Sequence, residues 1–283
     1  MNGQRTVRRR IRRCRCHAIV RDRTDLVYWA WPGGSPPTLL LHGIGNYGRY
    51  WDLFADAVAG RLSLVAPDAR GHGESGRPNE GYAAADFVAD ALAVMASAGI
   101  VRAVVVGHSM GGLHAIHLAS SHPDRVRALA IVDASPEPLP EGSERARRLL
   151  MERPARFASA AEARAYLERT SPGYSDAVYR NRLEWVFRRD GDARVWRSDQ
   201  RALAQIMTAR SPSDGRWRAL SSMAVPTLVV RGTRSNVLSP EVARRMAETL
   251  PNAKLLELDA GHNVALDRPR ELAEAVVSLA TRG

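Results

Sequence analysis

Residues 107–112, with the sequence GHSMGG, constrain the fold of this chain more than any other segment. They follow the apolar run at residues 102–106 and precede residues 113–119, which have a helical pattern. A G-x-S-x-G sequence between a strand and a helix predicts a turn so tight that its flanking positions lack bulky side chains. Such a turn raises the Ser109 hydroxyl clear of the backbone and directs the Met110 amide toward the place where an oxyanion would form. Ser109 is therefore a candidate nucleophile.

Strand and helix patterns alternate along most of the chain, which predicts an α/β fold. Two strands flanking a polar turn, at residues 17–21 and 26–31, are expected to form an antiparallel hairpin. Short apolar runs follow, as is typical of strands buried on both faces of a parallel sheet, at residues 38–42, 62–66, 102–106, 126–132, 227–231 and 254–258. Helical patterns lie between or after these runs, at residues 50–59, 83–98, 110–122, 240–250 and 268–280. We expect a doubly wound, mostly parallel sheet of eight strands.

The alternation is interrupted once, after the sixth strand. Residues 135–223 are polar, rich in arginine and helical in pattern, and they contain Trp185 and Trp196. We expect this segment to form a helical cap over the carboxyl edge of the sheet. The core would then comprise residues 17–134 and 224–283, preceded by a basic, flexible leader at residues 1–16.

The net charge of +11 does not indicate a nucleic-acid-binding protein. Of the 41 basic residues, 40 are arginine and only Lys254 is lysine, which indicates a compositional bias rather than a selected binding face. Seven of the arginines lie in the leader, so the remaining chain carries only 11 − 7 = +4. We expect a small-molecule substrate and no specific nucleic-acid partner, and the sequence leaves the oligomeric state open.

Several other classes of protein are disfavoured. No apolar run approaches 18 residues, so no membrane span is expected, and the leader lacks the apolar segment of an export signal. The sequence therefore favours a cytoplasmic location. Cys14 and Cys16 are one residue apart, which is poor spacing for a disulfide and too few ligands for zinc. No cofactor is expected, because the chain has neither a metal-ligand cluster nor a phosphate-binding glycine loop.

Polar motifs follow the predicted strands at the points where open α/β sheets bind ligands. These motifs are HGIGN at residues 42–46, PDARGHGES at residues 67–75, the Ser109 turn, and GHN at residues 261–263. The glycine at position 43 allows the backbone to approach a substrate, and the Ile44 amide is well placed to be a second oxyanion donor beside Met110.

This ordered set resembles the α/β-hydrolase family, in its cap-bearing, esterase-like branch, over roughly residues 17–280. The resemblance implies a nucleophile at Ser109, a general base at His262, and an oxyanion hole formed by the amides of Ile44 and Met110. His262 alone among the eight histidines combines a position after the last strand with the order of serine before histidine. Of the others, His42 and His72 match family positions that are usually structural.

The acid that would orient His262 is ambiguous. The resemblance places it after the penultimate strand, where this chain has Asn236 instead of a carboxylate. An amide can orient a neutral imidazole but cannot stabilise an imidazolium by its charge. Two alternatives stay open: Asp133, at the end of the sixth strand, supplies the acid, or Asn236 occupies the acid position and activity is low.

The predicted reaction is hydrolysis of an ester, thioester or lactone through an acyl-enzyme intermediate. Serine at position 109 argues against dehalogenase or epoxide hydrolase chemistry, for which relatives use a carboxylate. Candidate substrate-binding residues are Asn46, Tyr47, His108, Trp185 and Trp196. Alternatives are a carbon–carbon bond hydrolase, which usually has asparagine where His108 stands, a perhydrolase, and a low-turnover ligand-binding receptor, which Asn236 would favour.

Overall fold

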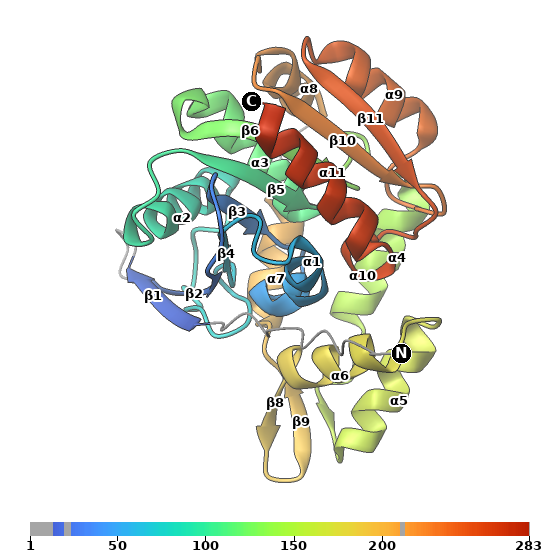
Figure 1. Ribbon diagram of the computed structural model, residues 1–283. Coiled ribbons are helices and arrows are strands. Elements are labelled where there is room, and N and C mark those ends of the chain that lie inside the picture. The colour runs from blue at the N-terminus through green and yellow to red at the C-terminus, as the bar shows by residue number, and fades with distance from the viewer. Residues whose placement is uncertain (1–13, 20–23, 210–212, 283) are drawn as a thin grey trace, which may run out of the picture.

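The computed structural model describes residues 14–19, 24–209 and 213–282 (Figure 1). Residues 1–13 of the expected leader lie outside the described residues. A central eight-stranded sheet has the order β1-β2-β4-β3-β5-β6-β10-β11. β2 pairs antiparallel with β1 and β4, and the other neighbouring strands are parallel. The prediction of a mostly parallel eight-stranded sheet is confirmed. Its strands are β1 (Cys14–Ile19), β2 (Asp25–Trp31), β3 (Thr38–Leu41), β4 (Leu64–Pro67), β5 (Ala103–His108), β6 (Val126–Val132), β10 (Thr227–Gly232) and β11 (Ala253–Leu258).

The expected N-terminal hairpin is present, but its first strand begins earlier than predicted. β1 starts at Cys14, three residues before the predicted start at residue 17, so Cys14 and Cys16 lie in a strand and not in a flexible leader. The reason is the length of the partner strand. β2 has seven residues, and Cys14 pairs with Ala30 near its end.

Helices cover both faces of the sheet, as a doubly wound fold requires. Alternate residues of β5 point to opposite faces: Val104 and Val106 belong to one apolar core and Val105 to the other. The first core is covered by α1 (Asp52–Val58), α10 (Val264–Asp267) and α11 (Pro269–Arg282); the second by α2 (Ala84–Ser97), α3 (Met110–Ser121), α8 (Ser213–Ser221) and α9 (Pro240–Thr249). Short 3₁₀ helices occupy Gly48–Trp51 and Pro123–Arg125. Among the helices that the structure describes, none is long and apolar enough to cross a membrane.

The insertion after β6 is more varied than the predicted helical segment. It contains α4 (Pro140–Met151), β7 (Arg156–Phe157), α5 (Ala160–Thr170), α6 (Asp176–Trp185), β8 (Phe187–Asp190), β9 (Ala193–Trp196), α7 (Gln200–Thr208) and then α8. The three strands form an antiparallel sheet of order β7-β9-β8, which the helical expectation missed. α8 packs on α3 in the layer of α2 and α9, with Leu220 buried in that core. We therefore use "cap" for residues 140–208, from α4 to α7.

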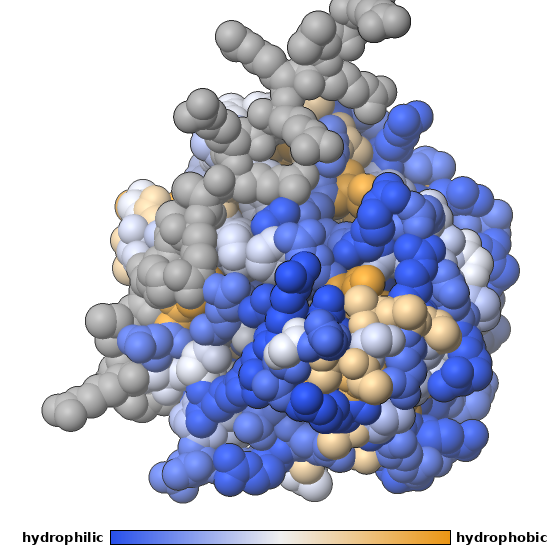
Figure 2. Space-filling view, turned by 90° about the horizontal axis from the view of Figure 1, so that it is seen from below, coloured by the Kyte–Doolittle hydropathy of each residue, from blue (hydrophilic) through white to orange (hydrophobic). Residues whose placement is uncertain are grey.

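An aromatic cluster holds the cap together. The rings of Phe187 and Trp196 lie 4.5 Å apart, and Phe157 lies 5.4 Å from Phe187. Tyr166 of α5 packs against Phe157 at 5.1 Å. Seen from the cap side, the surface of the described residues is largely hydrophilic, with smaller hydrophobic areas between the hydrophilic residues (Figure 2).

Candidate active site

Ser109 occupies the sharp turn between β5 and α3. Its backbone has φ 54° and ψ −119°, a conformation that side-chain-bearing residues rarely adopt. The Ser109 amide donates to the carbonyl of Val132 at 3.0 Å, which fixes the turn against the end of β6. Backbone strain of this kind persists where the surrounding structure over-determines it, often at a functional site.

Three glycines make this turn sterically possible. A Cβ on Gly107 would meet the backbone of Gly111, and a Cβ on Gly111 would meet the carbonyls of Leu41 and His42, all at under 3.0 Å. A Cβ on Gly112 would collide with the side chain of Ala134. The predicted absence of bulky side chains around Ser109 therefore has a specific cause: the start of α3 packs directly on the ends of β3, β5 and β6.

Ser109, His262 and Asp133 form one hydrogen-bonded series. His262 lies in the loop between β11 and α10, and its Nε2 is 3.0 Å from the Ser109 Oγ. The His262 Nδ1 is 2.7 Å from Oδ2 of Asp133. These residues come from positions 109, 133 and 262, and the fold joins them because all three follow strands at the same edge of the sheet.

Asp133 is completely buried, and its carboxylate is well supplied with hydrogen bonds. Its Oδ1 accepts from the Gly232 amide at 2.9 Å, and its Oδ2 accepts from the Ser235 hydroxyl at 2.5 Å as well as facing His262. Its backbone adopts φ 46°, a second strained residue at this site. These donors offset part of the cost of burying an ionised carboxylate.

Among the described residues, the hydrogen-bond partner of His262 Nδ1 is Asp133 and not Asn236. Asn236 lies half-buried in the loop after β10, and the neighbouring residue Ser235 faces the carboxylate of Asp133 instead. The Ser235 hydroxyl also accepts from the Val237 amide at 3.1 Å, which holds this loop in place. Sequence reasoning missed Ser235; its position immediately before the expected acid was the available signal.

Two buried histidines shape the loop beside Ser109. In His42, Nε2 accepts from the Ala69 amide at 3.0 Å while Nδ1 faces the Gly43 carbonyl at 2.7 Å. In His72, Nε2 accepts from the Gly45 amide at 2.9 Å. Burial lowers the pKa of His42 to about 3 and that of His72 to about 4, so both are neutral acceptors at pH 7.

This loop runs directly past Ser109. A Cβ on Gly43 would lie 3.1 Å from the Cβ of Ser109 and 3.0 Å from Nδ1 of His108, so glycine gives the backbone its close approach. Ile44, the next residue, and Met110, the first residue of α3, both line the same cavity as Ser109. The helix N-terminus at Met110 carries partial positive charge, which favours an anion there.

His108 supports the loop that carries His262. Its side chain is buried, and its Nε2 is 2.9 Å from the carbonyl oxygen of His262. Its ring stacks on Tyr50 with centroids 5.2 Å apart. Burial lowers the pKa of His108 well below its ordinary value, so the ring is neutral and Nε2 donates to that carbonyl. His108 therefore stabilises the loop that carries His262. It is not among the described residues that line the cavity beside Ser109.

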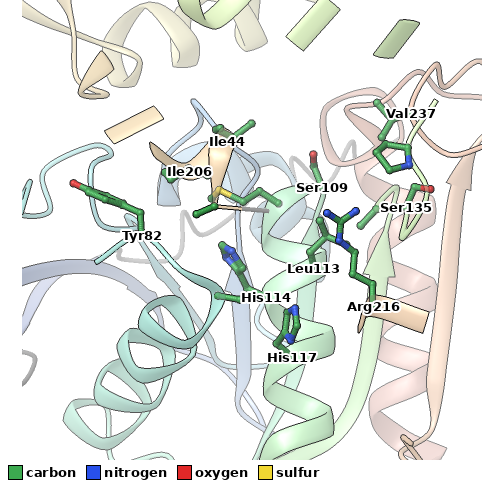
Figure 3. Close-up of a pocket in the computed structure, with 15 residues that line it drawn as sticks. Ile44, Tyr82, Ser109, Leu113, His114, His117, Ser135, Ile206, Arg216 and Val237 are labelled. Carbon is green, nitrogen blue, oxygen red and sulfur yellow. The ribbon is translucent and has the colours of Figure 1, made fainter. Parts of the chain in front are cut away.

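A cavity opens beside Ser109 and extends along one side of α3 (Figure 3). The space available to the centre of a water molecule is about 80 Å³. Its described lining is Ile44, Tyr82, Ala84, Ser109, Met110, Leu113, His114, His117, Ala134, Ser135, Pro138, Ile206, Ala209, Arg216 and Val237. The cap contributes Ile206 from α7, which packs with Tyr82 and Met110 in a small apolar cluster. Among the described residues, no group of acidic, histidine or cysteine side chains could hold a metal ion.

Four of the predicted substrate-binding residues are not among the described residues that line this cavity. Tyr47 is buried and donates its hydroxyl to Asn181 of α6 at 2.8 Å. Trp185 packs edge-on against Trp29 at 5.0 Å, and Trp196 belongs to the aromatic cluster of the cap. Asn46 is half-buried, and its amide donates to the Gly43 carbonyl at 3.1 Å. These side chains hold the cap and the loop in place, and this geometry does not support the expected role in the pocket.

Sequence comparisons identify related proteins over nearly the whole chain. The family model described as alpha/beta hydrolase fold matches residues 36–269. A 2-(acetamidomethylene)succinate hydrolase of Mesorhizobium japonicum is 27% identical over 248 residues, covering 87% of this chain and 88% of the relative. An esterase of Mycobacterium tuberculosis is 30% identical over 261 residues, covering 87% and 83% of the two chains.

Solved structures agree with the sequence relationships. The crystal structure of E-2-(acetamidomethylene)succinate hydrolase superposes with a TM-score of 0.85 at 24% identity, covering 95% of this chain and 99% of the other. At that identity the likeness speaks for the fold alone. The structure of the esterase from Mycobacterium tuberculosis has a TM-score of 0.77 at 26% identity, covering 98% and 92% of the two chains.

Proposed function

Because the chain belongs to the alpha/beta hydrolase fold family, we propose that it is a serine hydrolase that cleaves carboxylic ester, thioester or lactone bonds through an acyl-enzyme intermediate. One observation carries this proposal: the Ser109 hydroxyl lies 3.0 Å from His262, which lies 2.7 Å from a buried carboxylate. A serine hydroxyl is a weak nucleophile at neutral pH, and an adjacent imidazole oriented by a third group is the arrangement that activates it.

Each residue then has a definite role. His262 accepts the Ser109 proton through Nε2 as the Oγ attacks the carbonyl carbon, and Asp133 stabilises the imidazolium that forms. The amides of Ile44 and Met110 would donate to the oxyanion, and each such donor typically lowers the barrier by about 3 kcal/mol. His262 returns the proton to the leaving group, and a water molecule repeats the sequence to release the acyl group.

The geometry favours Asp133 over Asn236 as the acid. The receptor alternative depended on an asparagine beside the histidine, whereas here a carboxylate oxygen is 2.7 Å from Nδ1 of His262. Ser235 acts as a positioning residue, because its hydroxyl donates to the same carboxylate oxygen. This support for Asp133 argues for turnover and against a binding protein that has lost its acid.

A fluorophosphonate probe and a 4-nitrophenyl ester test the proposal together. We expect the probe to label Ser109 and the ester to be hydrolysed, with both signals lost in Ser109→Ala. Truncating the nucleophile of such a triad lowers kcat by about 10⁶-fold. Ser121→Ala is the matched control, because Ser121 is exposed at the far end of the same helix. Absence of labelling and of turnover on a panel of esters, thioesters and lactones would overturn the proposal.

A further inference from the structure

The cavity beside Ser109 follows α3 over two helical turns. Ser109, Leu113 and His117 are spaced four residues apart, and all three line it. With a rise of about 1.5 Å per residue, Leu113 is about 6 Å and His117 about 12 Å from Ser109 along the helix axis. The cavity is therefore deep enough to receive a short chain attached to the reacting carbonyl.

This cavity suits the acyl part of the substrate. Ile44 and Met110, whose amides would form the oxyanion hole, line it together with Ser109. His262 must reach the leaving group to protonate it, and its Nε2 is 3.0 Å from the Ser109 Oγ. With the leaving group beside His262, the portion that remains on Ser109 in the acyl-enzyme can extend along α3.

A buried arginine lines the part of the cavity beside Leu113 and His117, which we call its inner half. Arg216 of α8 is 7% exposed, and its Nη1 donates to the Pro136 carbonyl at 2.9 Å. Its guanidinium lies beside Leu113, between Ser109 and His117 (Figure 3). Burial and the nearby Arg216 charge lower the pKa of His117, which agrees with a guanidinium close to that ring.

The other polar groups at this end are neutral. Burial lowers the pKa of His114 to about 3, so its ring carries no charge at pH 7. None of the described lining side chains is a carboxylate. The carboxylate of Glu137, next to Pro136, accepts from Trp217 Nε1 at 2.5 Å and lies 3.4 Å from Nη1 of Arg245. Arg216 is thus the one formal charge among the described lining residues.

We propose that the inner half of this cavity binds a carboxylate at the end of the substrate's acyl chain, with Arg216 as its cationic partner. This inference rests on the proposed function and narrows it to esters, thioesters or lactones of carboxylate-bearing acids. A planar guanidinium matches a carboxylate in geometry and charge, and the interaction strengthens where water is excluded. Leu113, Met110, Ala134 and Ile206 provide an apolar wall for the methylenes between the two ends.

Matched substrates test this inference. Mono-4-nitrophenyl adipate and 4-nitrophenyl hexanoate have acyl chains of equal length and differ only in the terminal group, a carboxylate or a methyl. We expect kcat/KM to be at least about tenfold higher for the adipate, which corresponds to about 1.4 kcal/mol. Homologous pairs from five to eight carbons locate the chain length that the cavity prefers.

Substitutions on α8 assign the preference to one residue. Arg216→Met removes the charge at similar length, and we expect the adipate-to-hexanoate ratio to fall about tenfold; Arg216→Lys keeps the charge and should retain part of the ratio. Arg218→Met is the matched control, since Arg218 is exposed on the same helix. An equal ratio in wild type and Arg216→Met, or a wild-type ratio of one or less at every chain length, overturns the inference.

Direct binding keeps the inference testable if the Arg216 variants do not fold or if no ester is cleaved. Calorimetric titration of Ser109→Ala with monomethyl adipate and with methyl hexanoate, which has no carboxylate, should give at least about tenfold tighter binding of monomethyl adipate; equal affinities contradict the carboxylate site. Failure of the proposed function is recognised separately. It appears as an unlabelled Ser109 and no ester turnover, whereas hydrolysis that depends on Ser109 without preference for the carboxylate overturns only this inference.

Discussion

At the scale of single residues, Asp133 shows how a functional group is held in an unfavourable conformation. Its φ of 46° is a left-handed conformation that costs a side-chain-bearing residue about 1–2 kcal/mol. The strain is tolerated because the carboxylate accepts from Gly232 and Ser235 and faces His262. Backbone strain that is held in place in this way is typical of functional sites, which agrees with the proposed role of Asp133.

Exchanging acid and amide between positions 133 and 236 tests this assignment. Asp133→Asn keeps the shape but removes the charge that stabilises an imidazolium, so we expect kcat to fall by about 10⁴-fold. Asn236→Asp adds a carboxylate that does not face His262, so kcat should change by no more than about threefold. Steady-state kinetics on a 4-nitrophenyl ester measures both. An active Asp133→Asn enzyme together with a faster Asn236→Asp enzyme would move the acid to position 236.

A second residue-scale effect concerns stability and pH. His72 is fully buried with a pKa of about 4, compared with about 6.5 for an accessible histidine. Below pH 6.5 His72 is therefore protonated in the unfolded chain but stays neutral in the folded protein. The folded state loses stability as the pH falls toward 4. At pH 4.5 this loss is on the order of 2 kcal/mol for the single group.

Urea unfolding at pH 7 and pH 4.5 measures this loss, with His72→Gln as the comparison. The glutamine oxygen can accept from the Gly45 amide but does not titrate, so the variant should lose less stability than the wild type between the two pH values. Asp68 acts in the opposite sense. Burial raises its pKa to about 6, so its contribution to the stability of the folded state falls as the pH rises toward 6. Asp68 is common to both proteins, so the difference isolates His72; equal losses would refute the interpretation.

The sequence predicted the residues at strand ends better than the residues in the pocket. Ser109, Asp133 and His262 each follow a strand. Parallel strands have their carboxyl ends at one edge of the sheet, so these residues come together there regardless of how the loops are folded. The contacts of Tyr47 and Trp185 could not be predicted, because their partners, Asn181 and Trp29, are more than 100 residues away along the chain. Aromatic composition indicates burial, but it does not say against which surface a ring is buried.

At the scale of elements, the close contact between the start of α3 and the end of β3 determines where Ser109 lies. Gly111 sits where any Cβ would enter the carbonyls of Leu41 and His42, just before the loop with Ile44. A side chain at this position must displace either the turn that carries Ser109 or the end of β3. The position of Ser109 relative to the loop that contains Ile44 therefore depends on this one glycine.

Gly111→Ala should be strongly destabilising as a result. Overpacking of a rigid backbone contact typically costs 1–3 kcal/mol or more, so we expect a marked fall in the urea midpoint and in ester hydrolysis. Gly215→Ala is the matched control: Gly215 is helical with nothing within 4 Å of its Cβ position, and alanine should stabilise the helix by up to about 1 kcal/mol. If Gly111→Ala unfolds at or above the wild-type midpoint, the turn is not held by this contact.

Buried strands were predictable as elements, whereas peripheral ones were not. β5 and β6 are almost entirely apolar and buried, as is typical of strands in a sheet that is covered on both faces. β8 has three exposed residues, including Arg188 and Arg189, so its sequence carries no alternation that distinguishes it from helix or loop. It is a strand because β9 pairs with it and the ring of Trp196 packs on Phe187.

At the scale of the whole molecule, hydrogen bonds as well as apolar packing attach the cap to the core among the described residues. Asn181 of α6 is central: its Oδ1 accepts from the Tyr47 hydroxyl at 2.8 Å, and its Nδ2 donates to Asp52 at 3.0 Å. Tyr174 accepts from Asn263, next to His262, at 2.9 Å. The cap therefore contacts the loop that carries His262, and its Ile206 lines the cavity beside Ser109.

Loosening this attachment should affect the cap before the core. Asn181→Ala removes the acceptor of the buried Tyr47 hydroxyl, and leaving such a group without a partner costs about 1–3 kcal/mol. We expect faster proteolysis within residues 140–208 and a higher KM, because the wall that α7 contributes is less often in place, while the sheet remains resistant. Asn79→Ala, an exposed asparagine, serves as the control. Cleavage at the wild-type rate in Asn181→Ala would show that apolar packing of the cap, through Trp185 on Trp29, is sufficient to hold it on the core.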